Sequence, residues 1–285
     1  MKLAALGDIH SNRHALNACL EYIYSNGYDG IVFLGDYVSD CAYPQKTMDI
    51  LLNIPERYKT WFIRGNREDY MLDHRMKLSE EWSYNSQSGS LKYTFENLRS
   101  SDLRFFESMP IGMEIRIDGY PVFTVCHGTL RSSSELALPG SESMETLLDD
   151  MGTSLLVCAH SHTPFVYKRR GKTVVNGGTV GMSVNAQNCA QFISLTSDGG
   201  EWQYEQISVP YDYEATVRDI KESGLADKAD VWARTIIGML KTGRHYNMEC
   251  IDIVRRLCEE QSLPFDTEEP VSYTHLRAHE TGAYL

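Results

Sequence analysis

The chain has 285 residues, of which 42% are hydrophobic, and its 39 acidic and 27 basic residues give a net charge of −12. This size predicts one large domain, or one domain with an appendage, around a substantial core. Nucleic acid is an unlikely partner, because its phosphates would be repelled. No apolar run reaches the roughly 18 residues of a membrane-spanning helix. The short apolar start leads directly into a motif, so we expect a cytoplasmic protein without membrane contact.

The first quarter of the chain alternates between apolar, strand-like runs and amphipathic helical patterns. Residues 2–6, 30–34 and 60–63 are predicted strands, and residues 14–25 and 45–52 are predicted helices between them. This alternation predicts a βαβ core with a parallel sheet. In such sheets, functional sites lie beyond the carboxyl ends of the strands.

The pattern changes after the third strand. Residues 68–108 are predicted to be helical, with a break around residues 85–89. Short apolar runs separated by turn signals then follow. These runs predict strands at residues 113–117, 122–125, 155–159, 165–167, 173–175, 192–195 and 202–207. The sequence therefore predicts an α/β fold, a two-sheet sandwich flanked by helices.

The C-terminal part has a helical pattern. We expect residues 1–210 to form the main domain and residues 211–264 a helical appendage, which could mediate homo-oligomerisation or restrict access to a substrate. The helices are predicted at residues 213–223, 227–240 and 248–259.

Residues 271–285 differ from the rest of the chain. They show neither a helical nor a strand period, and they resemble one translated frame of a transposase sequencing adapter. We therefore interpret this segment as a non-functional scar. An ordinary disordered tail is the alternative.

Side chains that can bind metal ions occur at five places where a strand-like run gives way to a loop. Asp8 and His10 follow the first strand, and two residues apart on a strand they would face the same side. His160 and His162 repeat this spacing. Asp36 follows the second strand, and its carboxylate has two oxygens that could bridge two cations. The alternative for Asp36 is that it caps the next segment.

The remaining candidates are weaker when taken singly. Asn66, after Gly65, could supply a neutral oxygen or form a turn. His127 ends an apolar strand, where a lone histidine is more often structural. Cys126 and Cys158 lie near the motif histidines, but thiolates favour softer metals. Jointly, the oxygen and imidazole ligands predict a pair of divalent ions, an arrangement that cleaves phosphate esters.

At these residues the chain resembles the calcineurin-like metallophosphoesterase superfamily, especially its small bacterial phosphodiesterase branch. The resemblance covers about residues 1–200, and residues 176–181 look like the Gly-containing loop that follows the last block. The five blocks appear in order as Gly7-Asp8-Ile9-His10-Ser11-Asn12, Gly35-Asp36, Gly65-Asn66-Arg67-Glu68, His127-Gly128 and Ala159-His160-Ser161-His162-Thr163-Pro164.

The resemblance implies a role for each matching residue. A hydroxide between two divalent metal ions would attack phosphorus, and Asp36, Asn66 and Arg67 would form the catalytic group. Manganese suits this ligand set, with iron or zinc as alternatives. The implied ligands are Asp8, His10 and His162 for the first ion, and Asn66, His127 and His160 for the second, with Asp36 between them.

Arg67 departs from the family pattern, because many members have a histidine there that protonates the leaving oxygen. Arginine stays charged and is a poor general acid. It can bind phosphoryl oxygens bidentately, so we expect Arg67 to bind substrate and to favour good leaving groups. An ion pair with Glu68 or Asp69 is the alternative for this residue. His14 or His74 could replace the missing acid, although each is more typical of a helix surface.

Three functions are therefore considered. The first is a dinuclear metal-dependent phosphoesterase acting on phosphodiesters or nucleotide polyphosphates, with a small phosphate ester or nucleotide as its partner. The second is a serine/threonine phosphoprotein phosphatase. The third is a non-catalytic interaction module on the same fold, which would not need to keep all seven ligands.

Overall fold

The computed structural model describes residues 1–244, except residues 80, 86, 87 and 185, together with residues 246, 256 and 260. Most of the helix predicted at residues 248–259, and all of residues 271–285, lie outside the described residues. Within the described part, no helix is long and apolar enough to cross a membrane.

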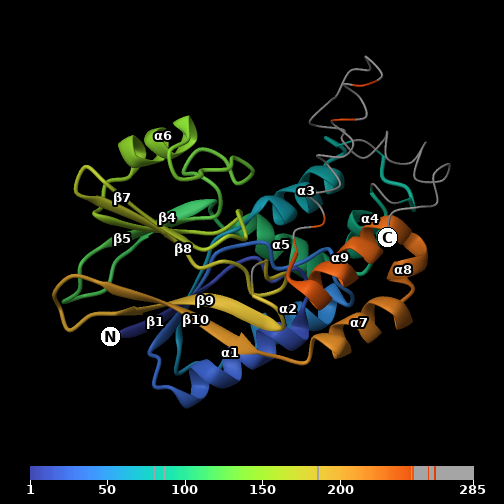
Figure 1. The fold of residues 1–285 in the computed structure, drawn as a ribbon, viewed down its shortest axis with the longest axis horizontal. Helices are drawn as coiled ribbons and strands as arrows, with labels where there is room; N and C mark the ends of the chain where they lie inside the picture. Colours follow the sequence, from blue (N-terminus) through green and yellow to red (C-terminus); the bar gives the residue numbers. More distant parts are fainter. Residues whose placement is uncertain are drawn as a thin grey trace.

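Two five-stranded sheets form the centre of the fold (Figure 1). The first has the strand order β10-β9-β1-β2-β3. Strands β1, β2 and β3 are parallel, as the βαβ pattern predicted. Strand β9 lies between β1 and β10 and runs antiparallel to both. The strands are β1 (Lys2–Leu6), β2 (Gly30–Phe33), β3 (Lys59–Phe62), β9 (Cys189–Thr196) and β10 (Gln203–Pro210).

The second sheet has the order β4-β5-β6-β8-β7. Its three inner strands are parallel, and an antiparallel strand closes each edge. The strands are β4 (Gly112–Ile115), β5 (Phe123–Cys126), β6 (Leu155–Cys158), β7 (Phe165–Arg169) and β8 (Lys172–Asn176). The predicted two-sheet α/β sandwich is therefore confirmed, and a shared apolar core that includes Leu3, Val125 and Val157 holds the sheets together.

Helices cover the outer faces of both sheets (Figure 1). Helices α1 (Arg13–Ser25) and α2 (Pro44–Leu52) pack on the first sheet. Helix α6 (Glu142–Asp150) packs on the second and was missed in the sequence. Its signals were an N-cap serine, Ser141, whose Oγ accepts the Met144 N–H, and apolar residues at three- and four-residue spacing.

The helical region predicted at residues 68–108 contains three helices, α3 (Asn66–Arg75), α4 (Gly89–Glu96) and α5 (Ser100–Ser108). The C-terminal helices are α7 (Tyr213–Glu222), α8 (Leu225–Lys228) and α9 (Asp230–Thr242). Within the described residues, these last helices share an apolar core with loops of the sandwich. Ile220 and Ile236 belong to one apolar cluster with Cys41 and Met182, which lie in loops beyond β2 and β8.

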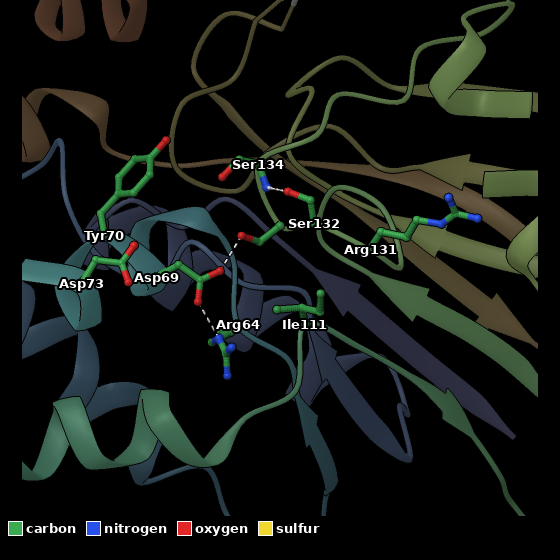
Figure 2. Close-up of a pocket in the computed structure, with 9 residues that line it drawn as sticks. Arg64, Asp69, Tyr70, Asp73, Ile111, Arg131, Ser132 and Ser134 are labelled. Atoms are coloured by element: carbon green, nitrogen blue, oxygen red, sulfur yellow. Dashed lines mark hydrogen bonds and ion pairs between the residues drawn. The ribbon is translucent and has the colours of Figure 1, made fainter. Parts of the chain in front are cut away.

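A polar cavity of about 390 Å³ lies between α3 and the loop after β5 (Figure 2). Asp69 joins its two walls, because its carboxylate accepts hydrogen bonds from Arg64 Nε and Ser133 Oγ, both at 2.5 Å. The lining residues are Arg64, Asp69, Tyr70, Asp73, Ile111, Arg131, Ser132, Ser133 and Ser134.

Candidate metal centre

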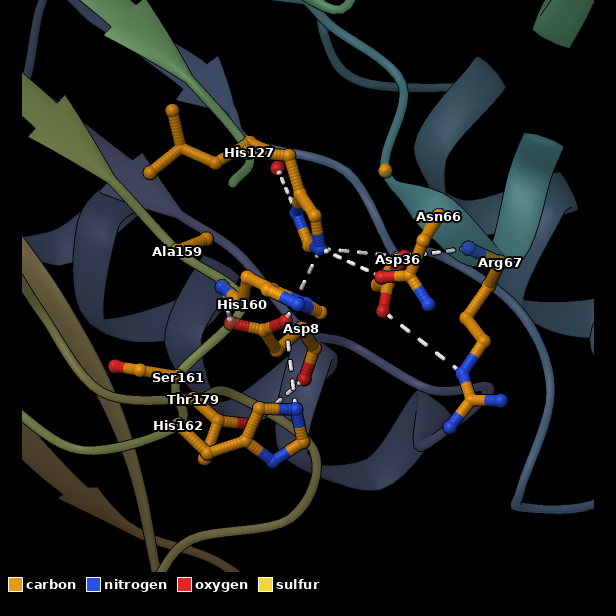
Figure 3. Close-up of polar contacts among 12 residues, drawn as sticks. Asp8, Asp36, Asn66, Arg67, His127, Ala159, His160, Ser161, His162 and Thr179 are labelled. Atoms are coloured by element: carbon orange, nitrogen blue, oxygen red, sulfur yellow. Dashed lines mark hydrogen bonds and ion pairs between the residues drawn. The ribbon is translucent and has the colours of Figure 1, made fainter. Parts of the chain in front are cut away.

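All seven predicted ligands lie just beyond the carboxyl ends of strands and converge on one place. Figure 3 shows six of them, Asp8, Asp36, Asn66, His127, His160 and His162. This is the edge at which the parallel strands of both sheets end, so residues far apart in the sequence meet there. Asp8 and His10 follow β1, Asp36 follows β2, Asn66 begins α3, His127 follows β5, and His160 and His162 follow β6.

The backbone at the centre is unusual. Asp8 and His10 have φ values of 54° and 49°, and Asp36, His160 and His162 also have positive φ. Non-glycine residues rarely adopt this left-handed conformation, and where they do they cluster at functional sites. The prediction that Asp8 and His10 face the same side through strand alternation was therefore wrong. Tight left-handed turns, rather than extended strands, bring the two side chains together.

The side chains form two groups that could each hold a metal ion. The ligand atoms of Asp8, His10 and His162 lie within 4.8 Å of one another, and so do those of Asp36, His127 and His160. Asn66 extends the second group, because its Oδ1 lies 3.1 Å from His127 Nε2. The division matches the one that the family resemblance implied.

Asp36 lies between the two groups. Its Oδ1 is 3.4 Å from His127 Nε2, whereas its Oδ2 is 3.7 Å from His10 Nε2. One carboxylate oxygen thus faces each group. The Arg67 backbone N–H donates to Oδ1 at 2.8 Å and helps to fix this orientation. Gly65 is required beside it, because a Cβ there would overlap the Asp36 carboxylate.

The histidine tautomers fit metal ligation. His127 Nδ1 contacts the Leu34 carbonyl oxygen at 2.7 Å, and His160 Nε2 contacts that of Ser134 at 3.1 Å. A carbonyl oxygen only accepts, so these nitrogens carry the protons and the opposite ring nitrogens are left as ligands. Asp8 Oδ1 is buried and makes no hydrogen bond with the described residues. Together, the unprotonated imidazole nitrogens and the carboxylate oxygen are ligand atoms that divalent cations bind.

The electrostatics also favour cations. Burial alone would raise the pKa of Asp36. The neighbouring His127, His10 and Arg67 have the larger effect and hold this pKa far below its usual value. Burial would lower the pKa of His127, yet the charges of Asp36 and Asp8 raise it to about 10. At His160, burial and the nearby His127 lower the pKa to about 4. The neighbouring carboxylates therefore keep a proton on His127, whereas burial and the charge of His127 keep His160 neutral.

Loading metal should displace the proton on His127. In the metal-free protein, the stabilising charge contact of His127 with Asp36 is fully present below about pH 6.5 and is lost as the pH rises through about 10. At pH 8 we therefore expect Mn²⁺ binding to release close to one proton from this histidine. Calorimetric titrations in two buffers of different ionisation enthalpy measure this release. Equal heats in both buffers would contradict the prediction, and a His127→Gln variant should abolish the difference.

Arg67 faces the centre from the start of α3. Its Nη2 lies 3.3 Å from Asp40 Oδ2, and its Nε lies 3.9 Å from Asp36 Oδ2. The expected alternative, an ion pair with Glu68 or Asp69, is wrong. Asp69 pairs with Arg64 instead, and the Glu68 carboxylate is taken up by backbone N–H groups. The Arg67 side chain is 20% exposed, and its buried Nε makes no hydrogen bond with a described residue.

Glu68 is a contributor whose role was missed in the sequence. Its carboxylate accepts the backbone N–H groups of Asp36, Tyr37 and Gly65, each at 2.8 Å. Burial and the neighbouring charge of Asp36 raise its pKa to about 7. By binding both ligand loops, Glu68 holds Asp36 close to the start of α3. An acidic residue at the third position of a helix was the available signal.

The other side chains considered lie elsewhere. Burial raises the pKa of both Cys126 and Cys158, the latter to about 12, so neither is a ready thiolate ligand. His14 Nε2 contacts Asp219 Oδ2 at 2.9 Å. His74 stacks on Trp82 with the ring centroids 3.9 Å apart. In the described part of the chain, these two histidines contact no predicted ligand.

The two-sheet sandwich, with candidate metal ligands in the loops at its strand ends, has the fold of a metallophosphoesterase. The family model described as calcineurin-like phosphoesterase matches residues 1–164, and the chain belongs to this family.

Three known proteins are similar to this chain over most of its length. The chain is 25% identical over 245 residues to the uncharacterized protein MJ0912 of Methanocaldococcus jannaschii, covering 79% of this chain and 94% of that protein. The hypothetical protein PH1004 of Pyrococcus horikoshii has a similar structure, with a TM-score of 0.71, 21% identity, and coverage of 85% of this chain and 98% of that one. A metallophosphoesterase from Sphaerobacter thermophilus has a TM-score of 0.67 at 20% identity, with 85% and 99% coverage. At these identities, the two structures support the fold alone.

Proposed function

We propose that this protein is a phosphoesterase that uses two divalent metal ions, with manganese the best suited, to hydrolyse phosphodiesters or nucleotide polyphosphates. The observation that carries the proposal is the position of Asp36, whose two oxygens face separate ligand groups. Two bound cations would supply Lewis acidity and an activated water. The family membership supports hydrolysis of a phosphoester bond.

The chain's own residues have distinct tasks in this proposal. Asp36 holds the two ligand groups together, and the Asn66 amide oxygen adds a neutral ligand beside His127. Arg67 binds a phosphoryl oxygen and stabilises the charge that develops on it. Because arginine cannot donate its proton at neutral pH, the leaving group must be stable as an anion. A phosphate or nucleotide leaving group meets this requirement better than a serine alkoxide.

The cavity beside α3 suits the organic part of a small substrate (Figure 2). It adjoins the centre, since the carbonyl of its lining residue Ser134 holds His160. Tyr70 contributes an aromatic ring to its lining, and Asp73 contributes a carboxylate. A volume of about 390 Å³ is in the range of pockets that enclose small molecules rather than protein surfaces. These features favour a nucleotide-sized ester.

A serine/threonine phosphatase activity is the second candidate. The chain is 31% identical over 135 residues to the serine/threonine-protein phosphatase PP2A-like PPG1 of Candida albicans, covering 47% of this chain and 30% of that protein. Because of this likeness, a phosphopeptide is the appropriate comparison substrate. Arg67, which is a poor proton donor to an alkoxide, counts against a phosphopeptide as the main substrate.

The decisive experiment is hydrolysis of bis(4-nitrophenyl) phosphate by metal-stripped protein titrated with Mn²⁺. The expected result is activity that appears with metal and saturates near two ions per chain. A phosphoserine peptide assayed in parallel should be cleaved more slowly. Faster cleavage of the peptide would favour the phosphatase. Failure to bind any metal would leave a non-catalytic interaction module on this fold.

Changing Arg67 to Ala should weaken substrate binding or transition-state stabilisation without loss of metal. The expected fall in kcat/KM is about 10- to 100-fold, the scale of a lost charge-assisted bidentate contact. Steady-state kinetics with metal analysis of the same sample provide the measurement. Arg116, which is 70% exposed and pairs with Glu114 of β4, offers a control in Arg116→Ala. Unchanged kcat/KM in the Arg67 variant would assign this residue a purely structural role.

A further inference from the structure

A buried carboxylate connects the metal centre to the C-terminal helices. Asp40 lies in the loop that follows Asp36 and is 1% exposed. Its Oδ2 lies 2.8 Å from His10 Nδ1 and 3.3 Å from Arg67 Nη2, and it accepts a hydrogen bond from Ser39 Oγ at 2.8 Å. One carboxylate oxygen therefore contacts both a candidate metal ligand and the residue assigned to the substrate.

The other oxygen of Asp40 is held by α9. Trp232 Nε1 donates to Asp40 Oδ1 at 2.7 Å, across 192 residues of sequence. An indole N–H is only a donor and sits on a rigid ring, so it fixes the position of the oxygen that accepts from it. The Asp40 backbone N–H is also bound, by Ser90 Oγ of α4 at 3.1 Å. Asp40 is thus held from two helices, its side chain by α9 and its backbone by α4.

We propose that Trp232 is a positioning residue that, through Asp40, sets the orientation of His10 for its metal ion and of Arg67 for the substrate. The C-terminal helices would then complete the metal centre, in addition to packing on the sandwich. This inference rests on the proposed function, because it assigns the imidazole of His10 to a bound cation.

The arrangement meets the physical requirements for this role. The contact between His10 Nδ1 and Asp40 is electrostatic rather than a well-aligned hydrogen bond. It still favours the proton on Nδ1, which leaves Nε2 facing Asp8, Asp36 and His162. Carboxylates in this position orient ligating histidines and raise their basicity. Without the indole, Oδ1 would be a buried acceptor with no partner and the carboxylate could turn away.

The surrounding packing fixes where Trp232 lies. Ala233 and Ile236, on the same helix, are buried in the cluster that also contains Cys41 and Ala42. The loop that carries Asp36 and Asp40 therefore packs directly against α9. A Cβ on Gly89, at the start of α4, would overlap the Lys228 carbonyl, so α4 and α8 are in close contact as well. Movement of α9 would be transmitted to this loop.

The test is a Trp232→Phe variant, which removes the N–H and keeps an aromatic ring. We expect calorimetric titration with Mn²⁺ to show weaker binding at one of two sites and little change at the other. Asp40→Asn should weaken the same site by about 10- to 100-fold. The double variant should be no worse than Asp40→Asn alone, because both changes act on one contact.

Trp202→Phe is the matched control. Trp202 Nε1 donates to the Pro121 carbonyl at 2.7 Å within the core between the sheets, away from the ligand loops. The Trp202→Phe variant should be less stable than the wild-type chain, and its affinity for Mn²⁺ at both sites should be unchanged. Circular dichroism and thermal melts show whether each variant is folded. If Trp232→Phe does not fold, Asp40→Ala removes the same contact from its acceptor side, and unchanged Mn²⁺ binding in that variant would overturn the proposal.

The outcomes separate the two hypotheses. If the wild-type chain binds no Mn²⁺, the proposed function itself fails. If the wild-type chain binds two ions, and Trp232→Phe binds both as tightly as Trp202→Phe does, the positioning role is overturned while the phosphoesterase remains. Fully additive effects of the Trp232 and Asp40 changes would also overturn it.

Discussion

Replacing Asp36 by Asn should reduce kcat for bis(4-nitrophenyl) phosphate by about 100- to 1000-fold, the scale for losing a preorganised electrostatic group. The change removes one negative charge from the position where the two ligand groups meet. An amide nitrogen also cannot act as a metal ligand in place of an oxygen. Steady-state kinetics, together with metal content per chain, measure both effects.

The fold should survive the Asp36→Asn change, because the backbone of this loop is held by Glu68 and not by the Asp36 side chain. Asp49→Asn is a matched control, since Asp49 of α2 forms an exposed ion pair with Arg99, which precedes α5, and Asp49 contacts no predicted ligand. It should leave turnover unchanged. Near-normal turnover in the Asp36 variant would rule out the assignment of the centre.

Removing metal should lower thermal stability and abolish activity. Without cations, the buried carboxylates of Asp8, Asp36 and Asp40 lie together with only Arg67 and protonated histidine to compensate them. Each ion present at 100 times its Kd would stabilise the fold by about 2.7 kcal/mol. In a protein of this size, that corresponds to a Tm shift of roughly 5–10 °C per ion.

Differential scanning calorimetry of chelated protein, before and after re-addition of Mn²⁺, measures this shift. Both the Tm and the activity should return with the metal. An identical Tm in the two states would show that the ligand groups do not bind cations tightly. The Trp202→Phe variant, whose change lies outside the centre, should show the same metal-induced shift as the wild-type chain.

Local sequence patterns were enough to predict most of the fold. The inner strands β2, β5 and β6 are buried apolar runs, so their own residues specify them. Helix α6 was missed because it is short and lies in a loop-rich stretch between β5 and β6. The left-handed turns at Asp8 and His10 were missed for a different reason. Neighbouring loops impose them, and local preference opposes them.

The sequence by itself determined which chemistry can occur at this centre. The ligand types, their order, and their place after apolar strands are all local features, and parallel strands bring such positions to one edge. Only the tertiary structure decided how these groups are oriented. The Asp36 oxygens, the Leu34 carbonyl behind His127, and the contact between Asp40 and Trp232 depend on packing between segments distant in sequence. No local pattern encodes such contacts, because they form only when the core that joins those segments is complete.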